Sequence, residues 1–412
     1  MKKSLSLLLV VLMLASLLPL NVGASETLTM WYWKNGIAEE IITGAEAEFG
    51  IDIDAEAVGG DFLAKITTTL AGGGELPDIL LLNDWLISLM PNADKWVNLL
   101  DAPYNAGEIK DQYYEWKWNM ALTTDGSQLI ALPIDTAPTA LFYRADLFEQ
   151  AGLEFEPEKV AEAYDTWDKI FAAGQQLQNS SFTYLFDNIE MVFMQSLAQI
   201  KGNHFFDTDN TFIGDQEHVK VCFDNAVKAS ELGVLMNINN WTPEWNAAVN
   251  NGDVAAFVGG VWMQGVLKDS APDTAGKWRV APAPGGPGNQ GGSFISVPAS
   301  SKNPELAYQV IKWMVSPENN VNNYVNLGVF PSTPASFDSE ALYVADEFFG
   351  GQKTAEVFKK VVDEMPLFYM APRHNVFRDF FTSELYLVAD QGKDPQAAWD
   401  SAVEASLREL QK

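Results

Sequence analysis

Tryptophan rings and short polar side chains recur together at the ends of predicted strands, a pairing suited to noncovalent binding of a small polar ligand. The groups are Trp33-Lys34-Asn35, Gly60-Asp61, Asn83-Asp84-Trp85, and Gly259-Gly260 followed by Trp262. An indole offers an apolar face, while carboxylates and amides offer hydrogen bonds. The two glycines would let another molecule approach the backbone closely. For Trp262, a core position in the first turn of a helix is the ordinary alternative.

Catalytic motifs are absent from the sequence. It contains no GxxxxGK[ST], GxGxxG, HExxH or GxSxG pattern, and its three histidines match no ligand spacing. The turn Asp207-Thr208-Asp209-Asn210 resembles the start of a calcium loop, but Phe212 and His218 stand where that loop needs glycine and glutamate. We therefore predict no catalytic residue, no metal and no cofactor. The 55 carboxylates make chance pairs inevitable, so counting alone leaves a two-carboxylate glycosidase open.

The elements that would position these residues follow a βαβαβ order. Residues 28–33, 51–57 and 78–82 have strand patterns, and the apolar faces of two helices lie between them. This order predicts an α/β lobe with right-handed crossovers, in which ligands bind beyond the carboxyl ends of the strands. Those ends carry the first three groups named above.

The stretch ALPIDTAPTALFYR, residues 131–144, indicates a connection between two lobes. Pro133 and Pro138 keep the backbone extended and remove two hydrogen-bond donors, so we expect a strand, a short exposed crossing and a second strand. Asp135 and Thr136 lie on that crossing and could contact a ligand held between the lobes. A plain strand-turn-strand connection is the alternative. Further crossings are expected near residue 280 and at residues 330–334.

The first residues predict export. Lys2 and Lys3 precede an apolar run, residues 5–18, and Val22-Gly23-Ala24 fits a signal peptidase site, so we expect a signal peptide of residues 1–24. The single cysteine, Cys222, allows no internal disulfide, and no cysteine is available at the cut site to carry a lipid. We therefore expect a soluble periplasmic protein without a lipid anchor.

The charge of the chain limits its partners. Removing the two signal lysines takes the formal charge from −29 to −31, which argues against nucleic acid and anionic lipid surfaces. The 13 Trp, 12 Tyr and 24 Phe exceed what a core alone requires, so some rings should line a groove.

Ordered segments of the chain resemble the family 1 extracellular solute-binding proteins of ABC importers, the class that includes maltose-binding protein. They include LTMWYW, GGGELPDILLLND, ALPIDTAPTALFYRADLFEQAGL, NNGDVAAFVGGVW, WRVAPAPGG, GGSFISVPASSKNPELAYQVIKWMVSPENN and GVFPS. Together the matching segments span almost the whole chain after residue 24.

The resemblance implies an α/β fold of two lobes, joined by three hinge crossings, that close on a ligand. By position, the first lobe is residues 25–134 with 281–329, and the second is 137–279 with 331–412. The implied ligand is a sugar or short oligosaccharide, delivered by a monomer to ABC permease subunits. The implied ligand contacts are Trp33, Lys34, Asn35, Asp61, Asp84, Trp85, Asp135, Asn188, Trp262, Gly292, Ser293 and Arg373.

Other functions remain open at this stage. A polar or cationic solute such as a polyamine is the first alternative, suggested by the acidic charge balance. A glycosidase or polysaccharide lyase is the second, and partnership with a chemoreceptor could coexist with transport.

Overall fold

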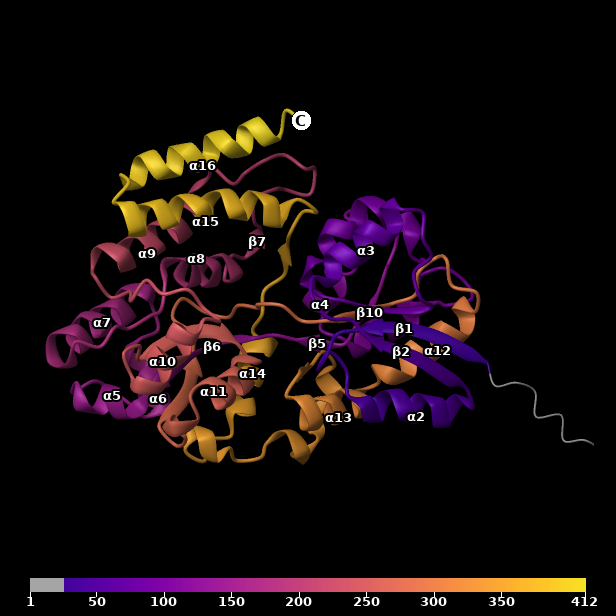
Figure 1. Ribbon diagram of the computed structural model, residues 1–412, viewed down its shortest axis with the longest axis horizontal. Helices are drawn as coiled ribbons and strands as arrows, with labels where there is room; N and C mark the ends of the chain where they lie inside the picture. The colour runs from indigo at the N-terminus through magenta and orange to yellow at the C-terminus, as the bar shows by residue number, and fades with distance from the viewer. Residues whose placement is uncertain (1–25) are drawn as a thin grey trace, which may run out of the picture.

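The computed structural model describes residues 26–412 and shows a mixed α/β chain arranged as two lobes side by side (Figure 1). The predicted signal peptide lies outside the described residues. Among residues 26–412, no helix combines the length and apolarity needed to span a membrane.

The first lobe is built on a five-stranded sheet with the order β2-β1-β3-β10-β4. β1 pairs in parallel with β2 and β3, whereas β10 runs antiparallel to both β3 and β4. The strands are β1 (Thr27–Tyr32), β2 (Asp52–Ala57), β3 (Ile79–Leu82), β4 (Leu132–Pro133) and β10 (Phe294–Ser296). All four side chains of β3 are fully buried, and burying each such side chain contributes about 1.5–3 kcal/mol. The predicted βαβαβ order is confirmed.

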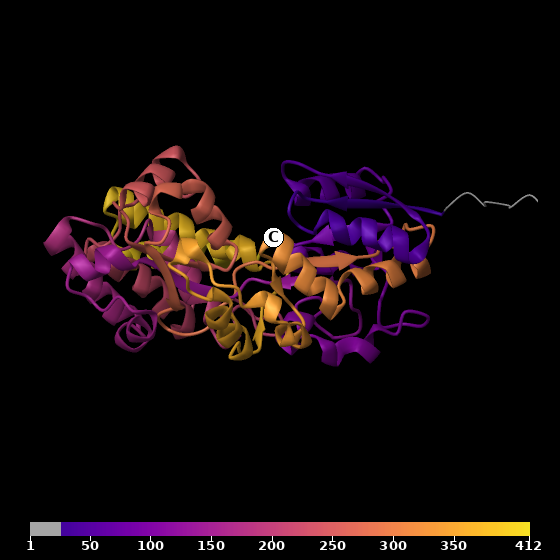
Figure 2. The ribbon, with the colours of Figure 1, turned by 90° about the horizontal axis from the view of Figure 1, so that it is seen from below.

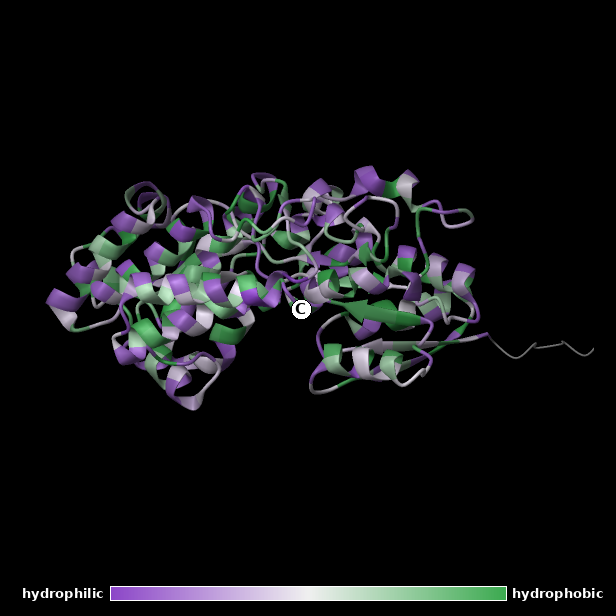
Figure 3. Cartoon of the chain, turned by 90° about the horizontal axis from the view of Figure 1, so that it is seen from above, coloured by the Kyte–Doolittle hydropathy of each residue, from purple (hydrophilic) through white to green (hydrophobic). Residues whose placement is uncertain are grey.

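Helices cover this sheet. They are α2 (Glu39–Phe49), α3 (Phe62–Ala71), α4 (Glu115–Asn119), α12 (Pro304–Met314) and α13 (Pro317–Leu327), with 3₁₀ helices η1 (Asp84–Lys95) and η2 (Ala106–Gln112). Figure 3 shows a contrast in this lobe: one strand is green along its length, whereas the helices alternate between purple and green. Only the apolar stripe of each helix is needed to cover the sheet.

The second lobe is built on a three-stranded antiparallel sheet with β6 at its centre, flanked by β8 and β9. The strands are β6 (Thr139–Arg144), β8 (Ala256–Gly260) and β9 (Trp278–Pro282). Every residue of β6 is buried. Helices therefore enclose this sheet on both faces, and the run TALFYR shows no alternation of apolar and polar residues.

The helices of the second lobe come from two separate parts of the chain, residues 145–270 and 354–409 (Figure 1). They are α5 (Ala145–Gln150), α6 (Pro157–Ala163), α7 (Trp167–Ser181), α8 (Ile189–Ala198), α9 (Glu217–Glu231), α10 (Pro243–Asn251), α11 (Met263–Ser270), α14 (Thr354–Asp363), α15 (His374–Gln391) and α16 (Pro395–Glu409). The 3₁₀ helices are η3 (Pro272–Thr274), η4 (Pro334–Asp338), η5 (Glu340–Leu342) and η6 (Glu347–Phe349), and the short strands β7 (Gly202–Asn203) and β12 (Phe368–Tyr369) pair in parallel.

Three chain segments cross between the lobes and are hydrogen-bonded to one another (Figure 2). In the first crossing, β5 (Asp135–Thr136) pairs antiparallel with β11 (Phe330–Pro331) of the third. The buried Ser332 hydroxyl donates to the Ile134 carbonyl at 3.1 Å, and Ile134 N–H donates to Ser293 of the second crossing at 2.9 Å. The connection between the lobes is therefore a two-stranded sheet, β5 with β11, to which the irregular second crossing is hydrogen-bonded.

The second crossing lies later than residue 280. β9 continues to pair with β6 through Ala281 and Pro282, and Thr139 N–H donates to the Gly288 carbonyl at 2.8 Å. Residues 281 and 282, which were expected in the first lobe, therefore belong to the sheet of the second lobe, because an apolar strand fits either lobe equally well.

The turn at Asp207 joins two short antiparallel segments. Phe206 and Phe212 form an antiparallel bridge, and the Asp207 carboxylate accepts from Asp209 N–H at 3.0 Å and Thr211 N–H at 2.8 Å. This aspartate therefore stabilises the turn itself. No cluster of three or more potential metal ligands occurs within residues 26–412.

Candidate functional site

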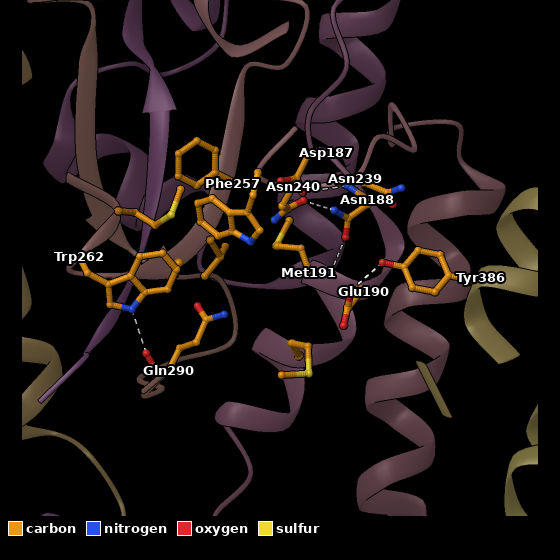
Figure 4. Close-up of a pocket in the computed structure, with 15 residues that line it drawn as sticks. Asp187, Asn188, Glu190, Met191, Asn239, Asn240, Phe257, Trp262, Gln290 and Tyr386 are labelled. Atoms are coloured by element: carbon orange, nitrogen blue, oxygen red, sulfur yellow. Dashed lines mark hydrogen bonds between the residues drawn. The ribbon is translucent and has the colours of Figure 1, made fainter. Parts of the chain in front are cut away.

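A cavity of about 290 Å³ opens in the wall of the second lobe (Figure 4). Four parts of the fold meet there: the end of β8 with the start of α11, the start of α8, the loop before α10, and α15. Gln290, from the second crossing, completes the wall. The lining residues are Asp187, Asn188, Glu190, Met191, Met194, Asn239, Asn240, Trp241, Phe257, Val258, Gly259, Trp262, Met263, Gln290 and Tyr386.

Trp262 forms one side of this cavity. It is half-buried, and its indole N–H donates to the Gln290 carbonyl at 3.0 Å, which ties the ring to the second crossing. A Cβ atom at Gly260 would overlap this indole, so the glycine is needed to accommodate the ring. The structure thus places Trp262 at a cavity wall rather than in a closed core.

A second tryptophan extends the aromatic surface. Trp241 is 57% exposed, and its ring centroid lies 5.7 Å from that of Trp262. Trp241 has a φ of 66°, in the left-handed region that tryptophan rarely adopts. Backbone strain of this kind concentrates at functional positions. The sequence analysis missed Trp241, because no strand or helix pattern marks the loop that carries it.

Two carboxyl groups supply the acidic side of the cavity. Asp187 accepts from the Trp245 indole at 3.0 Å and from Asn188 N–H at 2.8 Å, and burial raises its pKa to about 6. Glu190 accepts from the Tyr386 hydroxyl at 2.6 Å. Both carboxyl groups are therefore oriented by neutral donors.

Asn188 lines the same cavity, but its side chain also supports the fold. Its carbonyl oxygen caps α8 by accepting from Met191 N–H at 2.9 Å, and its amide donates to Asn240. The cap fixes the beginning of α8 at Ile189. Asn240 is thereby held at the cavity wall.

A smaller cavity of about 70 Å³ adjoins the first and shares Met194 and Gln290 with it. Both lobes line it: Asp84 follows β3 in the first lobe, and Arg378 lies on α15 in the second. Burial raises the pKa of Asp84, against the opposing effect of nearby cations. The predicted residue Asp84 thus lies at the interlobe part of the site.

A buried histidine pair, His204 and His374, also lines the smaller cavity. The ring centroids lie 5.2 Å apart, and both ring nitrogens of His204 lack a hydrogen-bond partner among the described residues. Burial lowers the pKa of His204 to about 4 and lowers that of His374 well below its usual value. Both rings are therefore neutral at pH 7.

The remaining predicted residues of the first lobe lie outside these two cavities. Trp33 and Trp85 pack on either side of Phe62, with centroid distances of 5.3 and 6.4 Å. Asp61 is exposed and caps α3 by accepting from Ala64 N–H at 2.9 Å. The structure therefore gives these residues local structural roles.

Lys34 and Asn35 line a different hollow, beside α2 and α13. Both are exposed, and Asn35 has a φ of 66°. The sequence correctly placed them after β1, but neither residue lines the two cavities described above.

Asp135, Gly292 and Ser293 are buried at the crossings. The Asp135 carboxylate accepts from Ser293 N–H, which links the first crossing to the second. Gly292 has a φ of 94°, and a Cβ there would lie 2.6 Å from the Lys117 ammonium. These residues therefore hold the crossings together. Arg373 lies apart and pairs with Glu409 of α16 at 2.6 Å.

Comparisons with known proteins agree with this architecture. The family model described as bacterial extracellular solute-binding protein matches residues 40–349. The lactose-binding protein of Rhizobium radiobacter is 26% identical over 376 residues, covering 85% of this chain and 86% of the relative. The arabinooligosaccharide-binding protein of Halalkalibacterium halodurans is 24% identical over 371 residues, covering 84% and 80%.

Solved structures give the same result. A crystal structure described as extracellular solute-binding protein family 1 superimposes with a TM-score of 0.86 at 28% identity, covering 92% of this chain and 98% of that one. The galacto-N-biose-/lacto-N-biose I-binding protein of an ABC transporter from Bifidobacterium longum shares the fold, with a TM-score of 0.76 at 20% identity, covering 94% and 98%. The chain belongs to the bacterial extracellular solute-binding protein family.

Proposed function

We propose that this chain is the sugar-binding component of an ABC importer, taking a sugar or short oligosaccharide in the interlobe site. One observation carries the proposal: the rings of Trp241 and Trp262 lie in the same cavity as the carboxyl groups of Asp187 and Glu190. A pyranose ring has apolar faces, which an indole can cover, and hydroxyl edges, which carboxylates and amides can bind. The names of the lactose- and arabinooligosaccharide-binding relatives support this ligand class.

A cationic solute such as a polyamine fits the cavity less well. Burial raises the pKa of Asp187 to about 6, and both carboxyl groups already accept hydrogen bonds from neutral donors. A neutral hydroxylated ligand does not require either group to be fully ionised. The acidic charge of the whole chain is therefore a weak guide to the charge of the ligand.

Binding would be completed by lobe closure. Asp84 lines the smaller cavity from the first lobe, and Met194 and Gln290 connect it to the tryptophan cavity. We propose that the first-lobe residues Trp33, Lys34, Asn35, Asp61 and Trp85 approach the ligand only in the closed form. Contacts present in one state alone shift the equilibrium towards it, and the closed form would be recognised by the permease.

The proposal includes the lobe limits and the location. The first lobe would be residues 25–134 with a return segment that begins after Pro282, because β9 pairs with β6. The second lobe would be residues 137–282 with 331–412. Export to a periplasm, cleavage before Ser25, a monomeric state and absence of catalysis belong to the same proposal. The basic and apolar residues before Ser25 support export.

Isothermal titration calorimetry against neutral mono-, di- and oligosaccharides, with spermidine as a cationic comparison, tests the ligand class. Trp262→Ala should weaken binding of the best saccharide by about 10-fold or more, since a ring in a desolvated pocket is an energetic anchor. Trp31→Ala is the matched control, because Trp31 is also half-buried but lies outside both cavities. Binding of spermidine alone, or release of product from chromogenic glycosides, would contradict the proposal.

A further inference from the structure

A fully buried tryptophan lies directly behind the larger cavity. Trp245, on α10, has 0% of its surface exposed and is not among the residues that line the cavity. It contacts three residues that do line it: its ring centroid lies 5.6 Å from that of Trp241 and 6.0 Å from that of Phe257, and its indole N–H donates to the Asp187 carboxylate at 3.0 Å. One buried side chain therefore joins the aromatic side of the cavity to its acidic side.

The exposed ring of Trp241 depends on this support. It is 57% exposed, and its contacts with other aromatic rings within residues 26–412 are with Trp245 and Trp262. Trp262 is itself fixed, because its indole N–H donates to the Gln290 carbonyl. Trp245 is therefore the second fixed surface that limits how the ring of Trp241 can turn.

The backbone near Trp241 is also tied to Trp245. The Thr242 hydroxyl accepts from Trp245 N–H at 3.1 Å, which caps α10, and it donates to the Asn239 carbonyl at 2.9 Å. These bonds close the loop in which Trp241 has a φ of 66°. They hold the backbone, but a side chain still turns about its own χ angles. The orientation of the Trp241 ring is therefore left to the rings that it packs against.

The hydrogen bond to Asp187 gives Trp245 a single orientation. The Asp187 carboxylate is 1% exposed, and it also accepts from Asn188 N–H at 2.8 Å. A flip of the indole would move its N–H away from this buried acceptor, and unpaired polar groups are costly where water is excluded. A phenyl ring has no N–H and so no such preference. The N–H therefore distinguishes tryptophan from phenylalanine at this position.

We propose that Trp245 is a positioning residue of the binding site: anchored by Asp187, it orients the ring of Trp241 for contact with the ligand. Trp245 itself does not touch the ligand. Asp187 then has a second role in addition to lining the cavity, since it fixes the residue that fixes Trp241. The inference rests on the proposed function for the ligand, but the orientation of Trp241 can be measured without one.

The first experiment uses ligand-free protein labelled with 5-fluorotryptophan. Fluorine NMR spectra are recorded for wild type and Trp245→Phe, with Trp241→Phe to assign the Trp241 signal. That signal should be narrow in wild type and should broaden or split in Trp245→Phe, because the ring then samples several orientations.

Trp278→Phe is the matched control for this experiment. Trp278 is also fully buried in the second lobe and donates its indole N–H to Thr274 at 2.8 Å, but it packs against Phe257 rather than Trp241. A single narrow Trp241 signal in Trp245→Phe, or equal broadening in Trp278→Phe, would overturn the inference.

The second experiment measures affinity for the best saccharide by isothermal titration calorimetry. Trp245→Phe should bind about 3-fold to 10-fold more weakly, because an aromatic anchor is no longer held in place. In the Trp241→Ala background the same change should have no further effect, because the ring that it positions is gone, so the two losses are not additive. Trp278→Phe should bind like wild type. A loss of equal size in both backgrounds, or in Trp278→Phe, would identify a merely structural role and overturn the inference.

Two provisions keep the outcomes separate. If Trp245→Phe does not fold, Asp187→Leu takes its place in the ligand-free experiment, since it removes the anchor and keeps Trp245; the Trp241 signal should broaden in the same way, and a narrow signal would overturn the inference. If wild type binds no saccharide, the proposed function fails, and the fluorine spectra still decide whether Trp245 orients Trp241.

Discussion

Replacing Gly292 by alanine should destabilise the protein through two separable effects. The first is conformational, because φ at this position is 94° and an L-residue is strained there, at about 1–3 kcal/mol. The second is steric, because the new Cβ would lie 2.6 Å from the Lys117 ammonium and 3.0 Å from the Asp135 carbonyl oxygen. Lys117 is fully buried, so a shift of its ammonium would press on packed neighbours, and this overpacking should add about 1–3 kcal/mol.

Gly286→Ala is the matched control. Gly286 also has a positive φ, of 123°, but no atom lies within 4 Å of an added Cβ. It should therefore share the conformational cost without the steric one. Guanidinium unfolding followed by tryptophan fluorescence compares the two variants, with the midpoint of each resolved transition measured separately, because two lobes can unfold independently.

A double-mutant cycle that combines Gly292→Ala with Lys117→Met isolates the contact between the new Cβ and the Lys117 ammonium. Methionine lacks the terminal nitrogen, so it should recover part of the steric cost of Gly292→Ala, while the contact with the Asp135 carbonyl remains. Contacting residues give coupling energies of about 0.5–3 kcal/mol in such cycles. If Gly292→Ala is no more destabilising than Gly286→Ala, or if the two changes are additive, the reasoning about this contact is wrong.

Three further predictions concern the cavities. Trp241→Ala should weaken saccharide binding, because the ring packs beside Trp262 in the cavity. It should change the melting temperature little, since the ring is 57% exposed. Isothermal titration calorimetry measures the affinity, and a thermal melting curve measures the stability. Burial favours the neutral forms of His204 and His374, so unfolded chains bind more protons below pH 6.5. Stability should therefore fall as pH drops from about 6.5 towards 4, and His204→Gln should reduce that slope in urea unfolding. The pKa of Asp187 is raised from 3.8 to about 6, so the folded state binds the additional proton, and this residue should lose about 3 kcal/mol of stability as pH rises through that window. Asp187→Asn should remove this loss, and an unchanged pH profile would contradict it.

The first sheet and the crossings were predictable from local patterns. The wholly apolar strand Ile79–Leu82 is confirmed as a buried strand of the first sheet. The prolines at 133 and 138 correctly indicated an extended connection, but the crossing was predicted to be exposed and is buried, because β11 of the third crossing pairs with it. The sheet to which residues 281–282 belong was not predictable, because pairing partners far apart in sequence decide it.

The site was harder to predict than the fold. Trp262 lines the larger cavity and Asp84 the smaller one, as predicted positions near a ligand. The two glycines before Trp262 had indicated that another molecule could approach the backbone there. Trp241 and Tyr386 carry no such signal, since one lies in an irregular loop and the other on the side of a long helix. Gly292 could be picked out from the sequence, but its contact with Lys117 could not be predicted, because Lys117 lies 175 residues earlier in the chain.

The return of the chain to the first lobe affects how this protein can be made. β3 pairs on one side with β1 and on the other with β10, whose residues follow more than 200 positions later. Until that segment emerges, a nascent chain presents an unpaired, wholly apolar edge, a template for aggregation. A fragment ending near residue 280 should therefore precipitate when expressed.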